Sequence, residues 1–245
     1  MKNFRIKLGK MFSFIKAGVV IIAFIVALIL LILSLISIGK DKKIVEDKLS
    51  DSVKFKNEYE KVNGKTNESD KTYPEVNISE KNEIKYSDYN EVINVITSGT
   101  GVIYLGYETC PWCRNSVPLL LQAAENTNLD KIYYINIKND RDVKILENGD
   151  VKTEKEGTEG YNNLLKALGE TASIYNGLND DSIKRIYAPT VIFVKNGVVQ
   201  SLHVSTVDSQ TDPYIPMTSL QRQELYNIYL NGILNIKDSS CDDAC

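Results

Sequence analysis

The chain has 245 residues and a formal net charge of −3, with 43% hydrophobic and 25% charged residues. This length suits one domain of ordinary size with flanking segments, and the nearly balanced charge gives no basis for binding nucleic acid. The four cysteines form two close pairs, Cys110/Cys113 and Cys241/Cys245. A disulfide framework would spread its cysteines along the chain to close large loops, so close pairs indicate redox or metal sites instead.

The segment 17–38 is predicted to be a single transmembrane anchor that holds the protein in the lipid bilayer. It carries no charged residue and consists almost wholly of Ile, Leu, Val, Ala and Phe. A helix of this length spans roughly 33 Å, close to the roughly 30 Å of bilayer hydrocarbon. Residues 1–16 are basic with no acidic residue, so we expect them in the cytoplasm and the C-terminal domain on the extracytoplasmic side. The alternative is a cleaved signal peptide, which would export the domain as well.

The next segment, 39–82, is rich in Lys, Glu, Asp, Asn and Ser and shows no good hydrophobic periodicity. A segment of this composition buries too little apolar surface to offset the entropy of ordering it. We therefore expect a polar stalk between the anchor and the folded domain.

From residue 83 onward the pattern becomes that of a folded α/β domain, which we expect to cover residues 83–234. Short apolar runs read as strands, amphipathic runs read as helices, and Asn196-Gly197 is a strong signal for a β-hairpin. Residues 139–187 are polar with helical stretches and are expected to form a helical insertion. The order of elements predicts a mixed central sheet with helices on both faces. The predicted strands are 83–86, 102–105, 131–137, 190–195 and 198–204, and the predicted main helices are 88–98, 111–127 and 218–234.

The central motif is Cys110-Pro-Trp-Cys113, which follows an apolar strand and begins a helix. Thiol–disulfide exchange needs a thiolate to attack and a second thiol close enough to form an intramolecular disulfide. The free amide groups at a helix N-terminus favour a thiolate there, and Pro111 suits the first turn because it has no N–H to leave unbonded. We therefore predict Cys110 as the nucleophile and Cys113 as the resolving thiol. Trp112 is expected to cover the pair and to offer an apolar contact to a client chain.

A zinc site also uses this spacing, but it usually combines two such pairs, or one pair with two histidines. The only histidine, His203, lies in a predicted strand far from the motif. We therefore predict no metal ligand set, while a metal-binding surface protein that uses all four cysteines stays an alternative.

Residues 83–234 resemble a thioredoxin-fold domain at several independent positions. A strand leads into the dithiol, Pro118 lies eight residues after Cys110, and Ala188-Pro189-Thr190 opens an apolar strand. The resemblance implies a cis peptide bond before Pro189, and it implies that Ala188 and Pro189 face the dithiol and bind an extended client. Residues 109–120 further resemble the membrane-attached bacteriocin transport accessory proteins of Gram-positive bacteria.

The chain departs from the thioredoxin pattern in three places, one of which is Thr109, where thioredoxins usually carry a tryptophan before the first cysteine. Thioredoxins carry a buried, proton-accepting aspartate six residues before the first cysteine, and here that position is Tyr104. Glu108 is an alternative candidate for proton transfer. The segment before Pro189 is also longer than in a minimal thioredoxin, as in oxidant-type proteins of this fold. These departures leave open whether the protein oxidises, reduces or isomerises its clients.

The second pair, Cys241 and Cys245, lies in a polar C-terminal tail, 235–245. It is either an incidental disulfide or a second dithiol that relays electrons to Cys110 and Cys113. The neighbouring Asp242 and Asp243 disfavour thiolates, which argues against this pair as the primary nucleophile.

The sequence as a whole predicts a membrane-anchored, extracytoplasmic thiol–disulfide oxidoreductase that needs no dissociable cofactor. Its expected partners are client proteins with thiols or disulfides and a membrane electron-transfer protein. The main alternative is an accessory or chaperone module for secretion whose fold does not need redox turnover.

Overall fold

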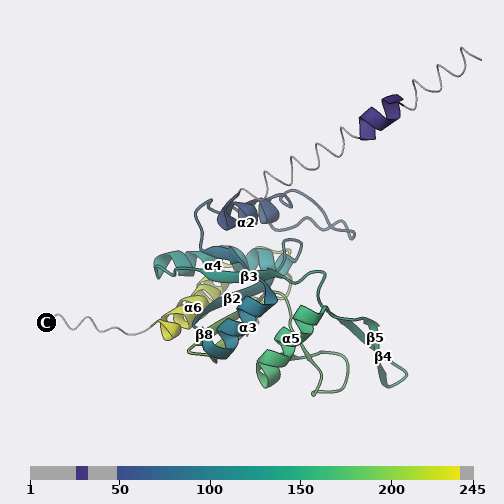
Figure 1. The fold of residues 1–245 in the computed structure, drawn as a ribbon. Helices are drawn as coiled ribbons and strands as arrows, with labels where there is room; N and C mark the ends of the chain where they lie inside the picture. Colours follow the sequence, from purple (N-terminus) through teal and green to yellow (C-terminus); the bar gives the residue numbers. More distant parts are fainter. Residues whose placement is uncertain (1–25, 33–48, 238–245) are drawn as a thin grey trace, which may run out of the picture. The chain divides into compact units, whose positions relative to one another are not determined.

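The structure, a computed structural model, describes residues 26–32 and 49–237 (Figure 1). The chain divides into two units, residues 1–49 and 50–245. In the first unit, residues 26–32 are helical and exposed. No helix among the described residues has both the length and the apolar character needed to cross a bilayer. The rest of the expected anchor, 17–38, lies outside the described residues, and the anchor therefore stays a prediction.

The second unit is built on a five-stranded mixed sheet in the order β1-β3-β2-β8-β9. Strands β1, β3 and β2 run parallel to one another, β8 is antiparallel to β2, and β9 is antiparallel to β8. The hairpin between β8 and β9 turns at Asn196-Gly197, where both residues have positive φ. The mixed sheet predicted from the sequence is thereby confirmed. The strands are β1 (Ile84–Tyr86), β2 (Gly101–Gly106), β3 (Ile132–Asn136), β8 (Thr190–Lys195) and β9 (Val198–Val204).

Helices cover both faces of this sheet, with α4 and α6 on one face and α3 and α5 on the other (Figure 1). Each begins at a residue whose side chain accepts a backbone N–H of the first turn, as Asp88 does for α3 and Thr218 for α6. Thr218 and Gln221 together form a capping box. The helices are α3 (Tyr89–Ser98), α4 (Pro111–Asn126), α5 (Glu159–Leu168) and α6 (Ser219–Ile236).

The central strand β2 supplies the middle of the core on both faces. Successive side chains of a strand point to opposite faces, so Val102 and Tyr104 join the cluster under α4 and α6. Ile103 and Leu105 join the cluster under α3 and α5. All four side chains are fully buried. The dithiol motif begins four residues after this strand ends and therefore follows the buried centre of the sheet.

The prediction of a polar stalk over residues 39–82 is wrong for residues 50–82, because these residues fold onto the domain. Helix α2 (Asp51–Glu60), capped by Ser50, buries Phe55 and Tyr59 completely. Val76 and Ile78, farther along the same segment, are buried in the same core cluster as Tyr104 and Tyr134. The remainder of the predicted stalk, 39–48, lies outside the described residues. The composition is polar on average, but a few apolar side chains are enough to anchor the segment. The folded domain therefore begins at residue 50 and not at residue 83.

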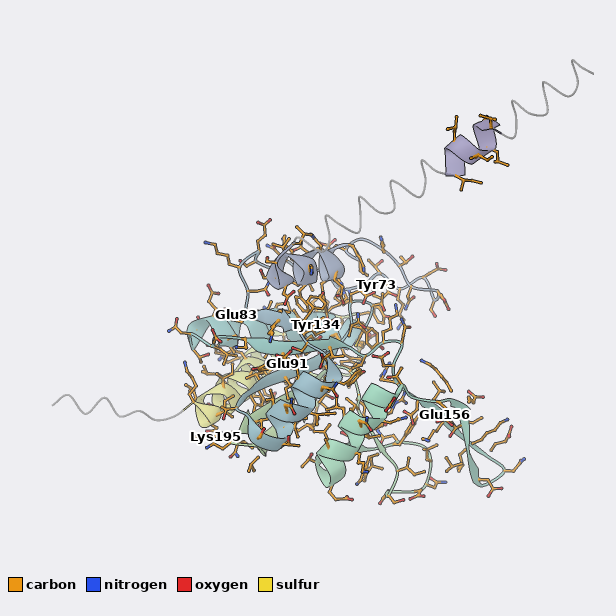
Figure 2. The ribbon with its side chains drawn as sticks, in the orientation of Figure 1. Tyr73, Glu83, Glu91, Tyr134, Glu156 and Lys195 are labelled. Atoms are coloured by element: carbon orange, nitrogen blue, oxygen red, sulfur yellow. The ribbon has the colours of Figure 1, made fainter. Side chains whose placement is uncertain are left out.

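The predicted helical insertion at 139–187 is helical only in part. It contains α5 and the short 3₁₀ helix η1 (Gly169–Thr171), but it also contains two small antiparallel hairpins. The first hairpin extends away from the sheet near Glu156, which is labelled in Figure 2. Its turn is Asn148-Gly149, where φ is positive at both residues, which favours a β-hairpin over the predicted helical structure. The hairpin strands are β4 (Val143–Glu147) with β5 (Asp150–Lys155), and β6 (Ser173–Ile174) with β7 (Lys184–Arg185).

Candidate functional site

The dithiol lies at the N-terminus of α4, as the sequence predicts. Cys110 is the N-cap residue, and its sulfur accepts the backbone N–H of Cys113 at 3.2 Å. Pro111 occupies the first turn of the helix, where no N–H is required. Both cysteines are free thiols in this structure. The Cys110 sulfur therefore faces the positive end of the helix dipole, which favours its thiolate form.

The predicted proline loop lies against this dithiol. The Ala188–Pro189 peptide bond is cis, as the resemblance implies. The Cys110 thiol donates a hydrogen bond to the carbonyl oxygen of Ala188 at 3.3 Å, which joins residues 78 positions apart in the chain. The backbone N–H of Ser205 donates to the Pro189 carbonyl at 2.9 Å and ties the loop to the end of β9. The fold therefore brings Cys110, Ala188 and Pro189 together.

The two thiols have different acidities. Burial alone would raise the pKa of Cys110, but hydrogen bonds from the thiol and the N–H of Cys113, together with the charge of Arg141, outweigh it and lower that pKa. Burial raises the pKa of Cys113 well above its usual range, and the neighbouring Cys110 raises it further. Cys110 is 3% exposed and Cys113 is fully buried. Cys110 is thus the more acidic and the more accessible of the two thiols.

Arg141, in the loop after β3, is a residue of this site that the sequence reasoning missed. Its guanidinium donates a hydrogen bond to the Tyr107 hydroxyl at 3.0 Å and stacks over the Tyr107 ring. Tyr107 precedes the dithiol, and its carbonyl accepts the N–H of Cys110. The contacts that hold Arg141 come from residues distant in the chain. The local sequence around Arg141 therefore indicated only that it follows a strand, and not that it lies near the dithiol.

Arg114, directly after Cys113, is a second residue that the sequence reasoning missed. It is 1% exposed, and its guanidinium donates to the carbonyl oxygens of Pro74, Tyr59 and Glu108 at 2.5, 2.8 and 3.1 Å. It also donates to the Asn63 side chain. Three of these four acceptors, Tyr59, Asn63 and Pro74, lie in the N-terminal segment 50–82, so Arg114 fastens the start of α4 to that segment.

The Tyr104 side chain occupies the interior beneath the dithiol, on the same face of the sheet as α4. Its hydroxyl makes a 2.7 Å hydrogen bond with the hydroxyl of Tyr59 from α2. Burial raises the pKa of both phenols well above their usual range, so neither ionises near neutral pH. Both side chains belong to the same buried cluster as Cys113.

Glu108, the predicted proton-transfer candidate, is largely buried and points toward the end of β3. Its carboxylate accepts a hydrogen bond from the Asn136 side chain at 3.1 Å and lies 3.8 Å from the Lys138 ammonium group. Neither thiol is among these partners. Its role in proton transfer stays a prediction.

A surface pocket of about 380 Å³ opens beside the dithiol. Its lining includes Trp112, Ile174 from β6, Tyr187 and Ala188. Ile174 is 40% exposed and is thus available to a ligand. Trp112 is half-buried, as expected for a residue that both packs on the core and contacts a partner. The pocket fits the predicted client-contact role of Trp112 and adds the short strand β6 to that surface.

The remaining predictions concern Cys241, Cys245 and His203. Cys241 and Cys245 lie outside the described residues, so their relay role stays a prediction. His203 is half-buried on β9, where its ring nitrogen pairs with the Thr206 carbonyl at 2.7 Å. Among residues 26–32 and 49–237 there is no cluster of three or more His, Cys, Asp or Glu side chains arranged to hold a metal ion.

The order and direction of the five strands, with a Cys-x-x-Cys dithiol at the start of α4 and a cis-proline opposite it, define a thioredoxin-like α/β fold. Among solved structures, the chain is similar to thioredoxin O2 from Arabidopsis thaliana in its oxidised state, with 17% sequence identity and a TM-score of 0.31. That likeness covers 51% of this chain and 85% of the plant protein. No protein-family model and no curated protein matches the chain.

Proposed function

We propose that the protein is a thiol–disulfide oxidoreductase that exchanges disulfides with client proteins through Cys110 and Cys113. The observation that carries the proposal is the difference between the two thiols. Cys110, at the helix N-terminus, has a lowered pKa and lies against the Ala188 carbonyl, whereas Cys113 is fully buried one turn farther on. This asymmetry provides one thiol for attack and a second for resolution.

The reaction proceeds in two exchanges. The Cys110 thiolate attacks a client disulfide, a bond forms between Cys110 and one client sulfur, and the other client sulfur leaves as a thiolate that takes up a proton. Cys113 then attacks the Cys110 sulfur, which forms the Cys110–Cys113 disulfide and releases the first client sulfur as a thiol. Two electrons pass from the dithiol to the client. The same steps in reverse oxidise a client dithiol, and the redox partners decide the direction.

The surface around the dithiol suits an extended client. The pocket beside Trp112, Ile174 and Ala188 offers an apolar contact for a client side chain next to the reacting cysteine. The Ala188 carbonyl, which accepts the Cys110 thiol in the free protein, becomes available to a client backbone N–H once Cys110 joins a mixed disulfide. Clients are accordingly proteins that present a cysteine in an extended segment.

The place of action that we propose is the extracytoplasmic face of a membrane. Support comes from the uncharged apolar segment 17–38 and the basic residues before it. A membrane protein that exchanges electrons with the Cys110/Cys113 pair would then reset it after each turnover. Labelling of intact cells with a membrane-impermeant thiol reagent tests this: modification of Cys110 supports the proposal, and modification only after lysis contradicts it.

The activity is tested with two cysteine variants and a disulfide-bonded peptide. Cys110→Ser should abolish exchange, because no attacking thiolate remains. Cys113→Ser should accumulate a stable mixed disulfide between the peptide and Cys110, detectable by mass spectrometry. A Cys113→Ser protein that captures no peptide would contradict the proposal and would favour the accessory role in secretion, for which the dithiol is not needed.

The direction of electron flow follows from the equilibrium potential of the Cys110–Cys113 disulfide. A reduction potential of about −120 mV indicates an oxidant, and a reduction potential of about −270 mV indicates a reductant. The measurement is made on a Cys241→Ser/Cys245→Ser protein, so that a single disulfide is titrated. Comparison of its turnover with that of the unaltered protein also tests the relay: unchanged turnover contradicts a relay through the tail.

A further inference from the structure

The insertion 139–187 contributes part of the lining of the pocket beside the dithiol. Three lining residues, Ser173, Ile174 and Asn176, come from β6 and the turn that follows it. The other lining residues belong to the motif, to the proline loop and to the end of β9: Trp112, Tyr187, Ala188, Val204 and Ser205. Four separate parts of the chain therefore meet around one cavity.

This pocket adjoins the reacting sulfur. Ala188, one of its lining residues, accepts the Cys110 thiol through its carbonyl oxygen at 3.3 Å. Trp112, another lining residue, stands between the two cysteines in the sequence. A client cysteine that is bonded to Cys110 therefore lies beside the pocket. A group that fills the pocket during exchange belongs to the part of the client close to that cysteine.

The walls of the pocket are held in place in the free protein. The Tyr187 hydroxyl accepts the backbone N–H of Asn176 at 2.8 Å, and the Arg185 guanidinium lies over the Tyr187 ring, 5.6 Å from its centroid. Ala172 and Tyr175, on either side of β6, are buried and fix that strand to the domain. A pocket formed in advance binds a ligand more tightly, because little has to be ordered on binding.

Ile174 is the apolar side chain that the insertion presents at this pocket. It is 40% exposed, although the next residue, Tyr175, is buried. Single exposed apolar residues are common on protein surfaces, so exposure alone carries no argument. Ile174 differs because it shares a pocket with Trp112 and Val204. An apolar client side chain placed there removes apolar surface of both molecules from water, which is favourable.

The charge and size of the pocket restrict what it can take. None of the eight residues that line it in the described part of the chain is charged. A charged client side chain would lose water there without meeting an opposite charge in the lining. The volume of about 380 Å³ is more than twice the roughly 150 Å³ of a cavity that holds benzene, so an aromatic ring fits.

We propose that this pocket selects clients with a large uncharged apolar side chain two residues from the reacting cysteine, and that Ile174 is the specificity-determining residue from the insertion. In an extended segment, successive side chains point to opposite sides. The side chain two positions away, at about 7 Å, thus lies on the same side as the cysteine sulfur. The inference rests on the proposed redox function and names the class of client segment that it takes.

The second cysteine pair of the chain does not fit this class. The residues two positions from Cys241 are Ser239 and Asp243, and Asp243 is also two positions from Cys245. Neither side chain is apolar, and one is charged. A peptide with the tail sequence is therefore expected to be a poor partner for this pocket and serves as a probe below.

The test measures how fast peptide disulfides form a mixed disulfide with Cys110. The protein is the Cys113→Ser/Cys241→Ser/Cys245→Ser variant, in which the product accumulates and is quantified by mass spectrometry. The probes are disulfide-linked homodimers of Phe-Ala-Cys-Ala-Phe, Ala-Ala-Cys-Ala-Ala, Asp-Ala-Cys-Ala-Asp and the tail sequence Ser-Ser-Cys-Asp-Asp-Ala. The Phe peptide should react roughly ten-fold faster than the Ala peptide, the scale expected when part of an aromatic side chain leaves water.

Two comparisons separate position and charge from general hydrophobicity. The isomer Ala-Phe-Cys-Phe-Ala has the composition of the Phe peptide, but its rings point to the other side of the strand. It should react within about two-fold of the Ala peptide. The Asp and tail peptides should react no faster than the Ala peptide. Faster reaction of either acidic peptide than of the Phe peptide would show selection by a cation such as Arg185 and would overturn the inference.

The role of Ile174 is tested by the ratio of the Phe-peptide rate to the Ala-peptide rate within each variant. This ratio should fall to about two or below in Ile174→Asp and to an intermediate value in Ile174→Ala. The side chain is partly exposed, so both variants should fold, which circular dichroism checks. The matched control is Val151→Asp, which replaces an apolar residue that is 38% exposed on the β4–β5 hairpin and should keep the ratio.

Trp112, the single tryptophan of the chain, reports occupancy of the pocket directly. Its emission should be shifted to shorter wavelength in the trapped Phe-peptide complex relative to the Ala-peptide complex. Equal rates for these two peptides, equal Trp112 emission in the two complexes, or an unchanged ratio in Ile174→Asp would each overturn the inference. A protein that forms no mixed disulfide with any of the peptides would instead contradict the proposed function.

Discussion

Two segments are added to the five-stranded core, and they behave in opposite ways although both are polar. The N-terminal segment 50–82 inserts Phe55 and Tyr59 into the core, where Tyr59 is hydrogen-bonded to Tyr104 of the central strand. The β4–β5 hairpin extends into solvent, and its apolar residues Val143 and Val151 are more than one-third exposed. Average composition does not distinguish the two. The difference lies in a few large side chains that find a place in the core.

The largest expected contrast between the segments is in core packing. Phe55→Ala should lower the free energy of unfolding by about 3–5 kcal/mol, because it empties a fully buried site between Tyr59, Tyr104 and Tyr134. Val151→Ala in the hairpin should change it by less than about 0.5 kcal/mol. Denaturant unfolding, followed by circular dichroism, measures both. Equal effects would show that the N-terminal segment is not an integral part of the core.

A somewhat smaller contrast is expected for the buried cation that joins the N-terminal segment to α4. Arg114→Met should cost about 2–3 kcal/mol of unfolding free energy, because the carbonyl oxygens of Tyr59, Pro74 and Glu108 lose their donor. The matched control is Lys152→Met on the hairpin, where the ammonium group pairs with Glu147 in solvent. This control should be indistinguishable from wild type. A stable Arg114→Met protein would mean that water replaces these contacts.

Arg141, at the base of the hairpin segment, is expected to affect how the reactivity of Cys110 depends on pH. The pKa of Cys110 is lowered, so its thiolate fraction, and with it the alkylation rate at pH 7, should exceed that of an ordinary thiol and fall as pH drops through that pKa. Arg141→Met should raise the pKa and reduce alkylation at pH 7 several-fold. Iodoacetamide kinetics across pH measure it.

The control for Arg141 is Arg185→Met, which removes a guanidinium that stacks on Tyr175 and Tyr187 instead of Tyr107. It should leave the alkylation profile in place. If both variants shift the profile equally, the effect belongs to the general positive charge of the surface, and Arg141 has no specific role.

The smallest effect is expected from shortening the hairpin itself. Replacement of residues 145–153 by a two-residue Asn-Gly turn should leave peptide reduction unchanged and alter the unfolding free energy by less than about 1 kcal/mol. The backbone N–H of Lys144, which donates to the Tyr175 hydroxyl at 2.9 Å, is retained in this design. A loss of exchange with retained folding would show that the hairpin contacts clients, and the two segments would then be functionally alike.

Much of the fold and of the site was predictable from the sequence. The dithiol at Cys110 and Cys113 and the turn at Asn196-Gly197 each carry a local pattern with a physical cause, a helix N-terminus or a positive φ. The cis bond before Pro189 was expected from the resemblance to thioredoxins alone. The helix that begins after Thr218 likewise carries its capping box in the sequence. Where local chemistry decides the structure, the sequence was sufficient.

The errors arose where tertiary contacts decide. The segment 50–82 looked like a stalk, because its anchoring residues are few and widely spaced among charged ones. Arg141 and Arg114 reach the dithiol region from positions whose meaning depends on the folded chain. Tyr104 was recognised as a departure from the thioredoxin pattern, but its partner Tyr59 lies 45 residues away on a helix that we did not expect.

The most direct test of the central claim is a redox titration of the Cys241→Ser/Cys245→Ser protein in glutathione or dithiothreitol buffers, with the disulfide mapped by mass spectrometry. We expect one reversible two-electron transition that joins Cys110 to Cys113 at a potential in the range of about −120 to −270 mV. A protein that forms no Cys110–Cys113 disulfide under any of these conditions, while it remains folded, would contradict it.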